Sequence, residues 1–193
     1  MKRIIFLTTI CLFILTKVKA QNHYFGIKVG YATSSASIPD GNLFIGSDGA
    51  SQGKDWFEWN NGFQIGVVAN IDIGYDFLHL DLSPQYSKYG YKNNDKVSLN
   101  YFDFDIGVSN LNSEVASKIV GGLGITPSLL ISSKNISDTN NFDLKIYMII
   151  GYRFSEKITV YAQAKYGLME LIPDSDIKNF QISLNINIPI FKI

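Results

Sequence analysis

Alternation of polar and apolar residues, repeated over eight long segments, constrains the fold of this chain more than any other feature. A period of two residues is typical of a strand whose two faces meet different surroundings. Most of these segments run for about 10–14 residues, whereas strands of soluble sheets are commonly about 5–6 residues long. The segments that we expect to be strands are Tyr24–Thr33, Gly62–Asp72, Phe77–Tyr91, Leu99–Val108, Lys118–Ile131, Phe142–Phe154, Ile158–Glu170 and Asn179–Phe191.

The two faces of these segments differ in chemistry in a way that decides the fold class. One face is aliphatic and aromatic almost throughout, as in Ile182, Leu184 and Ile186 of the last segment. The other face carries glycine, serine, asparagine and nine charged residues, which are Lys28, Asp72, Asp81, Asp103, Asp105, Asp143, Lys145, Arg153 and Lys165. Placing such charges in a dry core costs several kcal/mol for each unpaired ion. A sheet with its apolar face toward lipid avoids this cost.

The sequence therefore predicts an all-β fold, an eight-stranded antiparallel up-and-down transmembrane β-barrel with a polar lumen. In hydrocarbon every backbone donor and acceptor must be paired within the protein, so the sheet must close. Eight strands leave an interior just wide enough for side chains. We expect the nine charged residues to form a salt-bridged network that fills the lumen. A narrow ion path and a soluble β-barrel or sandwich stay open as alternatives.

The first twenty residues predict a secretory signal peptide. Lys2 and Arg3 precede an apolar run that is too short to span a bilayer, and Val18-Lys19-Ala20 forms a small-residue cleavage site. We expect cleavage between Ala20 and Gln21, which leaves one domain over residues 21–193. Cys11, the one cysteine, lies in the leader, so disulfides do not stabilise the mature chain. Without the leader, 13 bases face 17 acids, and this net charge of −4 argues against a nucleic-acid partner.

The connections between segments predict the orientation of the barrel. Those at 73–76 and 155–157 are tight, whereas 34–60, 92–96, 132–141 and 172–178 are rich in Asn, Asp, Ser, Gly and Lys. Short periplasmic turns and longer outer loops are typical of outer-membrane barrels. Aromatic residues near the strand ends suit belts at the two interfaces; they are Tyr31, Phe63, Tyr86, Tyr152, Phe154, Tyr166 and Phe180.

Two local features bear on binding and on strand pairing. Trp56, Phe57 and Trp59 close the long first loop, where they could engage a partner protein or lipopolysaccharide, or anchor the next strand at the interface. Three prolines lie inside expected strands, where each removes a ladder donor; they are Pro84, Pro127 and Pro189. We expect β-bulges to accommodate them.

The sequence offers little support for catalysis or for a metal site. His79, Asp81 and Ser83 share one face, but alternate side chains on one strand lie about 6.8 Å apart, too far for the hydrogen bonds of a catalytic triad. That face also points away from membrane lipid. His23 and His79 are isolated, and no calcium-loop spacing is present. We expect no enzymatic activity, no metal and no cofactor.

Four motifs resemble the PorT-type outer-membrane β-barrel family of diderm bacteria. They are Leu82-Ser83-Pro84-Gln85-Tyr86-Ser87-Lys88-Tyr89-Gly90, Asn100-Tyr101-Phe102-Asp103-Phe104-Asp105, Gly122-Leu123-Gly124-Ile125-Thr126-Pro127 and the run from Asp143 through Gly151-Tyr152-Arg153-Phe154 to Ala164-Lys165-Tyr166-Gly167-Leu168. They occur in the family's order and cover the mature chain. Gln85 and Asp105 depart from a usual Glu and Pro, and the chain ends on Ile193 rather than on an aromatic residue. The resemblance implies an outer-membrane barrel.

Together these observations predict an integral protein of the cell outer membrane, non-enzymatic, with a structural role or one in loop-mediated binding. A narrow pore, an accessory of a protein secretion complex and a lipid-modifying enzyme are the alternatives. The expected partners are outer-membrane lipids, the barrel-assembly machinery during biogenesis, and a secretion-system or surface partner.

Overall fold

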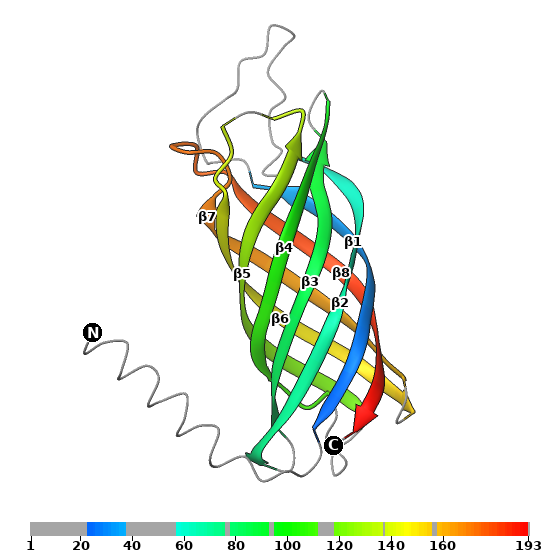
Figure 1. Cartoon of the computed structure of the whole chain (residues 1–193). Helices are drawn as coiled ribbons and strands as arrows, with labels where there is room; N and C mark the ends of the chain where they lie inside the picture. Colours follow the sequence, from blue (N-terminus) through cyan, green and yellow to red (C-terminus); the bar gives the residue numbers. More distant parts are fainter. Residues whose placement is uncertain are drawn as a thin grey trace, which may run out of the picture.

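Eight antiparallel strands, each paired with the next along the chain, close into a barrel where β8 pairs back onto β1 (Figure 1). The structure, a computed structural model, describes residues 23–37, 57–75, 78–92, 95–111, 118–136, 138–155 and 158–192. The strands are β1 (Tyr24–Ala36), β2 (Glu58–Tyr75), β3 (Leu78–Lys92), β4 (Lys96–Ser109), β5 (Ile119–Lys134), β6 (Phe142–Ser155), β7 (Ile158–Glu170) and β8 (Lys178–Lys192). The predicted up-and-down topology is confirmed. The predicted leader with its Ala20–Gln21 cleavage site, and Trp56, lie outside the described residues.

The two ends of the barrel differ. At the end that we call the turn end, β1 begins and β8 ends, and Gly74 adopts a φ of 86° in the turn between β2 and β3 (Figure 1). The backbone N–H of Gly74 donates to Asp72 Oδ1 (2.7 Å), which closes this turn. The opposite end, the loop end, carries the connections that follow β1, β3, β5 and β7. Within the described residues, no helix is long and apolar enough to cross a membrane.

Several strands extend farther toward the loop end than the alternation predicted. β2 begins at Glu58 rather than Gly62, and β1 continues to Ala36 rather than ending at Thr33. The extensions are paired, with Glu58 opposite Lys92 and Ser34 opposite Asn60. Ladder hydrogen bonds therefore continue beyond the point where the outward face stops being apolar.

The sheet has its apolar face outward. On β8 the Leu184 side chain is 58% exposed, whereas its neighbour Asn185 is fully buried in the lumen. Every strand repeats this arrangement, so the outer wall is lined by valine, isoleucine, leucine and aromatic residues, while amides, hydroxyls and ions lie inside. A protein in water would bury the opposite face. The predicted inversion of the sheet is confirmed.

The lumen is filled in three layers along the barrel axis. At the loop end an apolar cluster lies inside the wall; it consists of Ala36, Tyr89, Tyr91, Val97, Leu99, Tyr101, Leu171 and Ile177, with Phe57 packed against it. Nearer the turn end, a second apolar cluster consists of Leu111, Val120, Tyr147, Ile149 and Tyr161. Buried polar and charged side chains lie between the two clusters, and others lie at the level of the clusters themselves, such as Asn60 beside Val97 and Asp81 opposite Gly107 near Tyr147.

Candidate functional site

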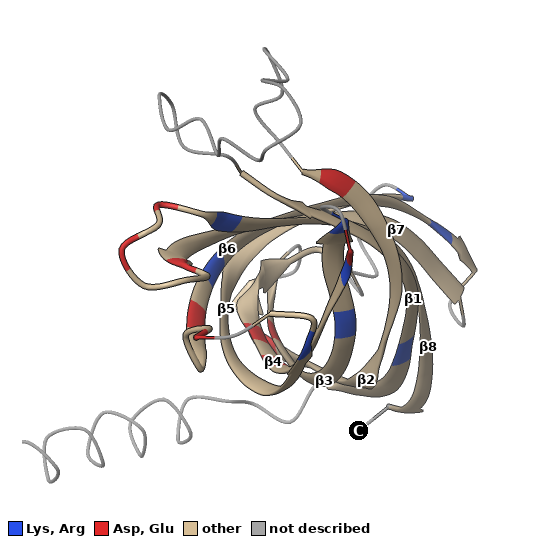
Figure 2. Ribbon diagram, turned by 90° about the horizontal axis from the view of Figure 1, so that it is seen from above, with Lys and Arg blue, Asp and Glu red and all other residues tan. Residues whose placement is uncertain are grey.

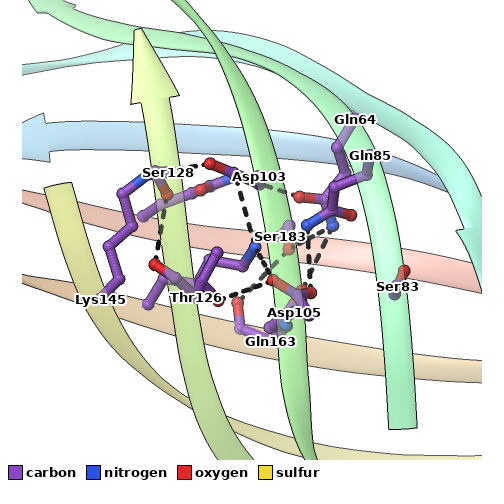
Figure 3. A network of polar contacts seen from close by, with 12 residues as sticks. Gln64, Ser83, Gln85, Asp103, Asp105, Thr126, Ser128, Lys145, Gln163 and Ser183 are labelled. Carbon is purple, nitrogen blue, oxygen red and sulfur yellow. Dashed lines mark hydrogen bonds and ion pairs between the residues drawn. The ribbon is translucent and has the colours of Figure 1, made fainter. Parts of the chain in front are cut away.

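Asp105 on β4 is the centre of the polar layer. Lys28 Nζ donates to its Oδ2 at 2.9 Å and Lys165 Nζ to its Oδ1 at 2.6 Å. Gln85 Nε2 and Gln163 Nε2 each donate to Oδ2 at 3.0 Å, and Thr126 Oγ1 to Oδ1 at 2.7 Å (Figure 3). Charge-assisted hydrogen bonds of this kind are the stronger ones in proteins. One carboxylate thus holds together five side chains from four other strands, β1, β3, β5 and β7.

Asp103, two residues before Asp105 on the same inward face, pairs with Lys145 and shares Lys165 with Asp105. Lys145 Nζ lies 3.2 Å from its Oδ1 and Lys165 Nζ 3.4 Å from its Oδ2. Lys145 also lies 4.5 Å and 4.4 Å from the ring centroids of Tyr89 and Tyr101, within cation–π range. These two rings stack in parallel, with centroids 4.9 Å apart. The aromatic pair therefore joins the ionic layer to the apolar cluster at the loop end.

The network crosses the lumen rather than following neighbouring strands. Its lysines come from β1, β6 and β7 and both aspartates from β4, which lies three strands away from β1 in the sheet. Seen from above, basic and acidic positions lie on the barrel wall (Figure 2). An eight-stranded barrel has an interior narrow enough for side chains to meet across it.

Buried amides extend the network toward β8. Gln163 Oε1 accepts from Lys28 Nζ at 3.1 Å, Gln64 Nε2 donates to Ser183 Oγ at 3.1 Å, and Gln181 Nε2 donates to Gln64 Oε1 at 3.2 Å. The sequence predictions did not include these amides, because charge alone does not indicate them. Their inward position in the alternation was the signal that could have found them.

The structure corrects the prediction that nine charged residues form one network. It brings together Lys28, Asp103, Asp105, Lys145 and Lys165, and it places the other four elsewhere. Asp81 hydrogen-bonds to Asn70 on the neighbouring strand. Asp143 accepts from Asn179 Nδ2 at 3.2 Å, near the loop end.

Asp72 and Arg153 lie at the turn end, too far along the barrel to reach the polar layer. Asp72 closes the turn before β3, and Arg153 donates to the backbone oxygens of Asn110 (2.8 Å) and Leu111 (2.6 Å). Alternation along a strand predicted that both side chains face inward, but it did not indicate their height. Height along the axis decides which inward charges can meet.

The aromatic residues of the first loop separate in the structure. Phe57 stacks on Tyr91, with centroids 4.7 Å apart, and packs against the apolar cluster at the loop end. Trp59 lies on the outer wall, edge-on to Phe180 at 5.8 Å. The two therefore do not form one exposed binding cluster: Phe57 precedes β2 and packs inside the barrel, whereas Trp59 lies within β2 and is exposed on the outer wall.

The three prolines are accommodated in two different ways. Pro189 lies opposite Gly26, where the β1–β8 register shifts, as predicted for a bulge. Pro84 and Pro127 lie at interruptions of the β2–β3 and β4–β5 ladders, and the register continues unchanged across both. The prediction of bulges at these two positions is wrong.

Ser83 explains how the ladder tolerates Pro84. Proline has no N–H to donate to β2, and the Ser83 hydroxyl instead donates to the backbone oxygen of Val67 on β2 at 2.8 Å. His79 and Asp81 face the same lumen, on the strand that carries Ser83. The residue considered as a nucleophile therefore has its hydroxyl in a structural hydrogen bond.

Replacing Ser83 by alanine is expected to lower the free energy of unfolding by about 1–3 kcal/mol, because it leaves the Val67 carbonyl without this donor. Urea-induced unfolding in detergent or vesicles would measure the change. Ser87→Ala is the matched control: Ser87 is equally buried on the same face of β3, but its hydroxyl makes no hydrogen bond among the described residues. We expect a change within about 0.5 kcal/mol for this control, and equal effects of the two substitutions would contradict the assignment.

Among the described residues, no three or more His, Cys, Asp or Glu side chains gather closely enough to hold a metal ion.

Comparison with known proteins supports the fold. The chain is similar in structure to Neisserial surface protein A, with 14% sequence identity over 86% of this chain and 97% of that one, at a TM-score of 0.51. Weaker similarities are found to the attachment invasion locus protein Ail of Yersinia pestis (14% identity, 88% and 99% covered, TM-score 0.49) and to the outer membrane protein AlkL (15% identity, 91% and 92% covered, TM-score 0.45). No family model matches the sequence, and no curated protein matches it.

Proposed function

We propose that the chain is an integral, non-enzymatic protein of a bacterial outer membrane, with a structural role or one in binding through its loops. The observation that carries this proposal is the inverted sheet, which exposes aliphatic and aromatic side chains around the barrel and buries ions within it. Only a lipid environment makes such an outer wall favourable, and a closed barrel leaves no unpaired edge in the hydrocarbon. The similarity in fold to Neisserial surface protein A supports the same conclusion.

The proposal places the loop end outside the cell, because outer-membrane barrels combine short periplasmic turns with longer outer loops. Single cysteines at Asp138 near the loop end and Tyr75 at the turn end test this orientation, since both residues are exposed. On intact cells, a membrane-impermeant maleimide is expected to label Asp138→Cys and to label Tyr75→Cys only after lysis. The reverse pattern would contradict the orientation, and labelling of both on intact cells would contradict membrane insertion.

We further propose that the barrel does not conduct ions. The ionic layer lies between two apolar clusters, and the lysines and aspartates of the layer pair with one another. In planar bilayers the purified protein is expected to show no discrete conductance steps, under conditions in which a porin conducts. Regular steps that scale with the number of inserted molecules would favour the narrow-pore alternative.

The resemblance to the PorT-type family is proposed on the four motifs, which fall on β3, β4, β5 and the pair β6–β7 in order. Their residues occupy structural positions: Ser83 replaces a ladder donor at Pro84, and Asp103 and Asp105 hold the polar layer. Gly124 leaves room for Tyr147, because a Cβ there would lie 2.7 Å from the Tyr147 ring. These residues stabilise the wall and the interior of the barrel. The resemblance therefore supports the fold, and we do not extend it to a role in secretion.

A further inference from the structure

The outer wall carries a one-sided group of lysines near the loop end. Lys88 on β3, Lys96 on β4 and Lys134 on β5 are exposed, and none makes an ion pair with another described residue. Lys92 lies nearby but pairs with Glu58 at 3.1 Å. Among the residues that the structure describes, Asp95 in the turn before Lys96 is a second carboxylate at this edge. The three lysines therefore present positive charge to the outside of the barrel.

Strand register places neutral hydrogen-bonding groups between these lysines. Lys88 lies opposite Asn100, Asn100 opposite Ser132, and Ser98 opposite Lys134. Side chains directly opposite on one face have Cβ atoms about 4.5–5.5 Å apart. We call the surface formed by Lys88, Lys96, Ser98, Asn100, Ser132 and Lys134 the lysine face.

Hydrogen bonds order the centre of the lysine face. Tyr86 Oη donates to Asn100 Oδ1 at 2.8 Å, and Asn100 Nδ2 donates to Ser132 Oγ at 2.8 Å. At its upper edge, Asn135 Nδ2 donates to the backbone oxygen of Lys96 at 3.0 Å, which ties the end of β5 to the start of β4. The polar groups are thus fixed relative to the three strands.

The height of the lysine face matches the head-group region of a bilayer. Tyr86 is one of the aromatic residues expected in the belt at the loop end, and its ring lies 5.9 Å from that of Phe63. Lys88 is the next outward residue beyond Tyr86, about 7 Å farther along the strand. Aromatic belts lie at the level of the lipid head groups, and lysine side chains extend from such positions toward charged groups.

The charge on the far side of the loop end has the opposite sign. Glu170, Asp174 and Asp176 lie at or beyond the end of β7, with Lys178 opposite Glu170, and acidic positions gather on the loops there (Figure 2). Asp138 follows β5, next to the lysine face. Acidic side chains therefore gather beyond β7, whereas β3, β4 and β5 carry the three exposed lysines of the lysine face.

We propose that the lysine face binds the phosphate-bearing head group of an anionic lipid in the membrane leaflet at the loop end. Ammonium groups attract the phosphate, and the hydroxyl and amide groups between them supply neutral donors. Each lysine near an anionic membrane surface strengthens the attraction to that surface about fivefold, and we expect a similar factor for an anionic lipid at the lysine face. The proposal rests on the proposed function for its location in the cell, but the binding itself can be measured on the purified protein.

Native mass spectrometry of the folded protein in detergent, with phosphatidylglycerol or phosphatidylcholine added, tests this proposal. The wild-type protein is expected to retain phosphatidylglycerol in preference to phosphatidylcholine. The double variant Lys88→Gln/Lys134→Gln is expected to bind phosphatidylglycerol about 25-fold more weakly. The matched control is Lys118→Gln/Lys178→Gln, which removes two lysines outside the lysine face and is expected to bind as the wild type does.

Equal weakening by both double variants, or no weakening by either, would overturn the proposal. Heat-modifiable migration on gels verifies that each variant is folded, so loss of binding is distinguishable from loss of the barrel. Because this experiment needs no cell envelope, its failure is also distinguishable from a failure of the proposed location, which the maleimide labelling tests.

Discussion

Replacing Asp105 by leucine is expected to lower the free energy of unfolding by about 3–5 kcal/mol, the cost of removing one partner from a buried ion pair. The substitution leaves Lys28 without its carboxylate and Lys165 with only Asp103, at 3.4 Å. Both lysines stay buried in the lumen, where an unpaired ammonium is costly. Urea-induced unfolding of the reconstituted protein, followed by tryptophan fluorescence, would measure the loss.

Two further variants determine whether the loss comes from unpaired charge. Asp72→Asn removes a carboxylate of the half-buried turn before β3 but keeps an acceptor for the Gly74 N–H, so a change within about 0.5 kcal/mol is expected. Adding Lys28→Met to Asp105→Leu removes the unpaired ammonium and is expected to restore much of the lost stability, because apolar replacement of a whole buried pair is often neutral. No recovery in this double variant would mean that the hydrogen bonds of Asp105 to Gln85, Gln163 and Thr126 dominate instead.

The sequence predicted the wall of the barrel more completely than its interior. Alternation depends only on neighbouring residues, so it indicated correctly that Leu184 faces outward and Asp103 inward. Which inward residues meet depends on the stagger of the strands around the closed barrel, and this brings Lys28 of β1 to Asp105 of β4. Stagger is a property of the whole sheet, and no local pattern contains it.

The position of a residue along the barrel axis accounts for the remaining differences between the sequence predictions and the structure. Asp72 and Arg153 occupy inward positions of the alternating pattern, but both lie at the turn end. There Asp72 accepts from the backbone N–H of Gly74, and Arg153 donates to the backbone oxygen of Leu111. The hydroxyl of Ser83 was open to a catalytic interpretation until the neighbouring strand was known, because its acceptor is a backbone oxygen of β2. The proposed lipid-binding role of the exposed lysines also depends on the fold, because the pairing of β3, β4 and β5 brings them onto one surface.

Replacing Leu184 by arginine is expected to destabilise the protein in lipid vesicles by about 2–4 kcal/mol, the cost of a charge on the lipid face near the bilayer midplane. Leu184 is 58% exposed and lies near the middle of β8, between the aromatic residues Phe180 and Phe191. In a water-soluble barrel, arginine at the same exposed position would change the free energy of unfolding by no more than about 0.5 kcal/mol. The size of the effect therefore tests the membrane assignment itself, and unfolding from vesicles in urea would measure it.

Depth provides the control for this substitution. Ile190 is also exposed on β8 but lies near the turn end, where an arginine can reach the head groups and is expected to cost about 0–1 kcal/mol. A steep difference between Leu184→Arg and Ile190→Arg would show that the surroundings of the outer wall change from hydrocarbon to water along one strand. If both substitutions were tolerated equally, the outer wall would not lie in hydrocarbon, and the inverted sheet would need another apolar partner to cover it.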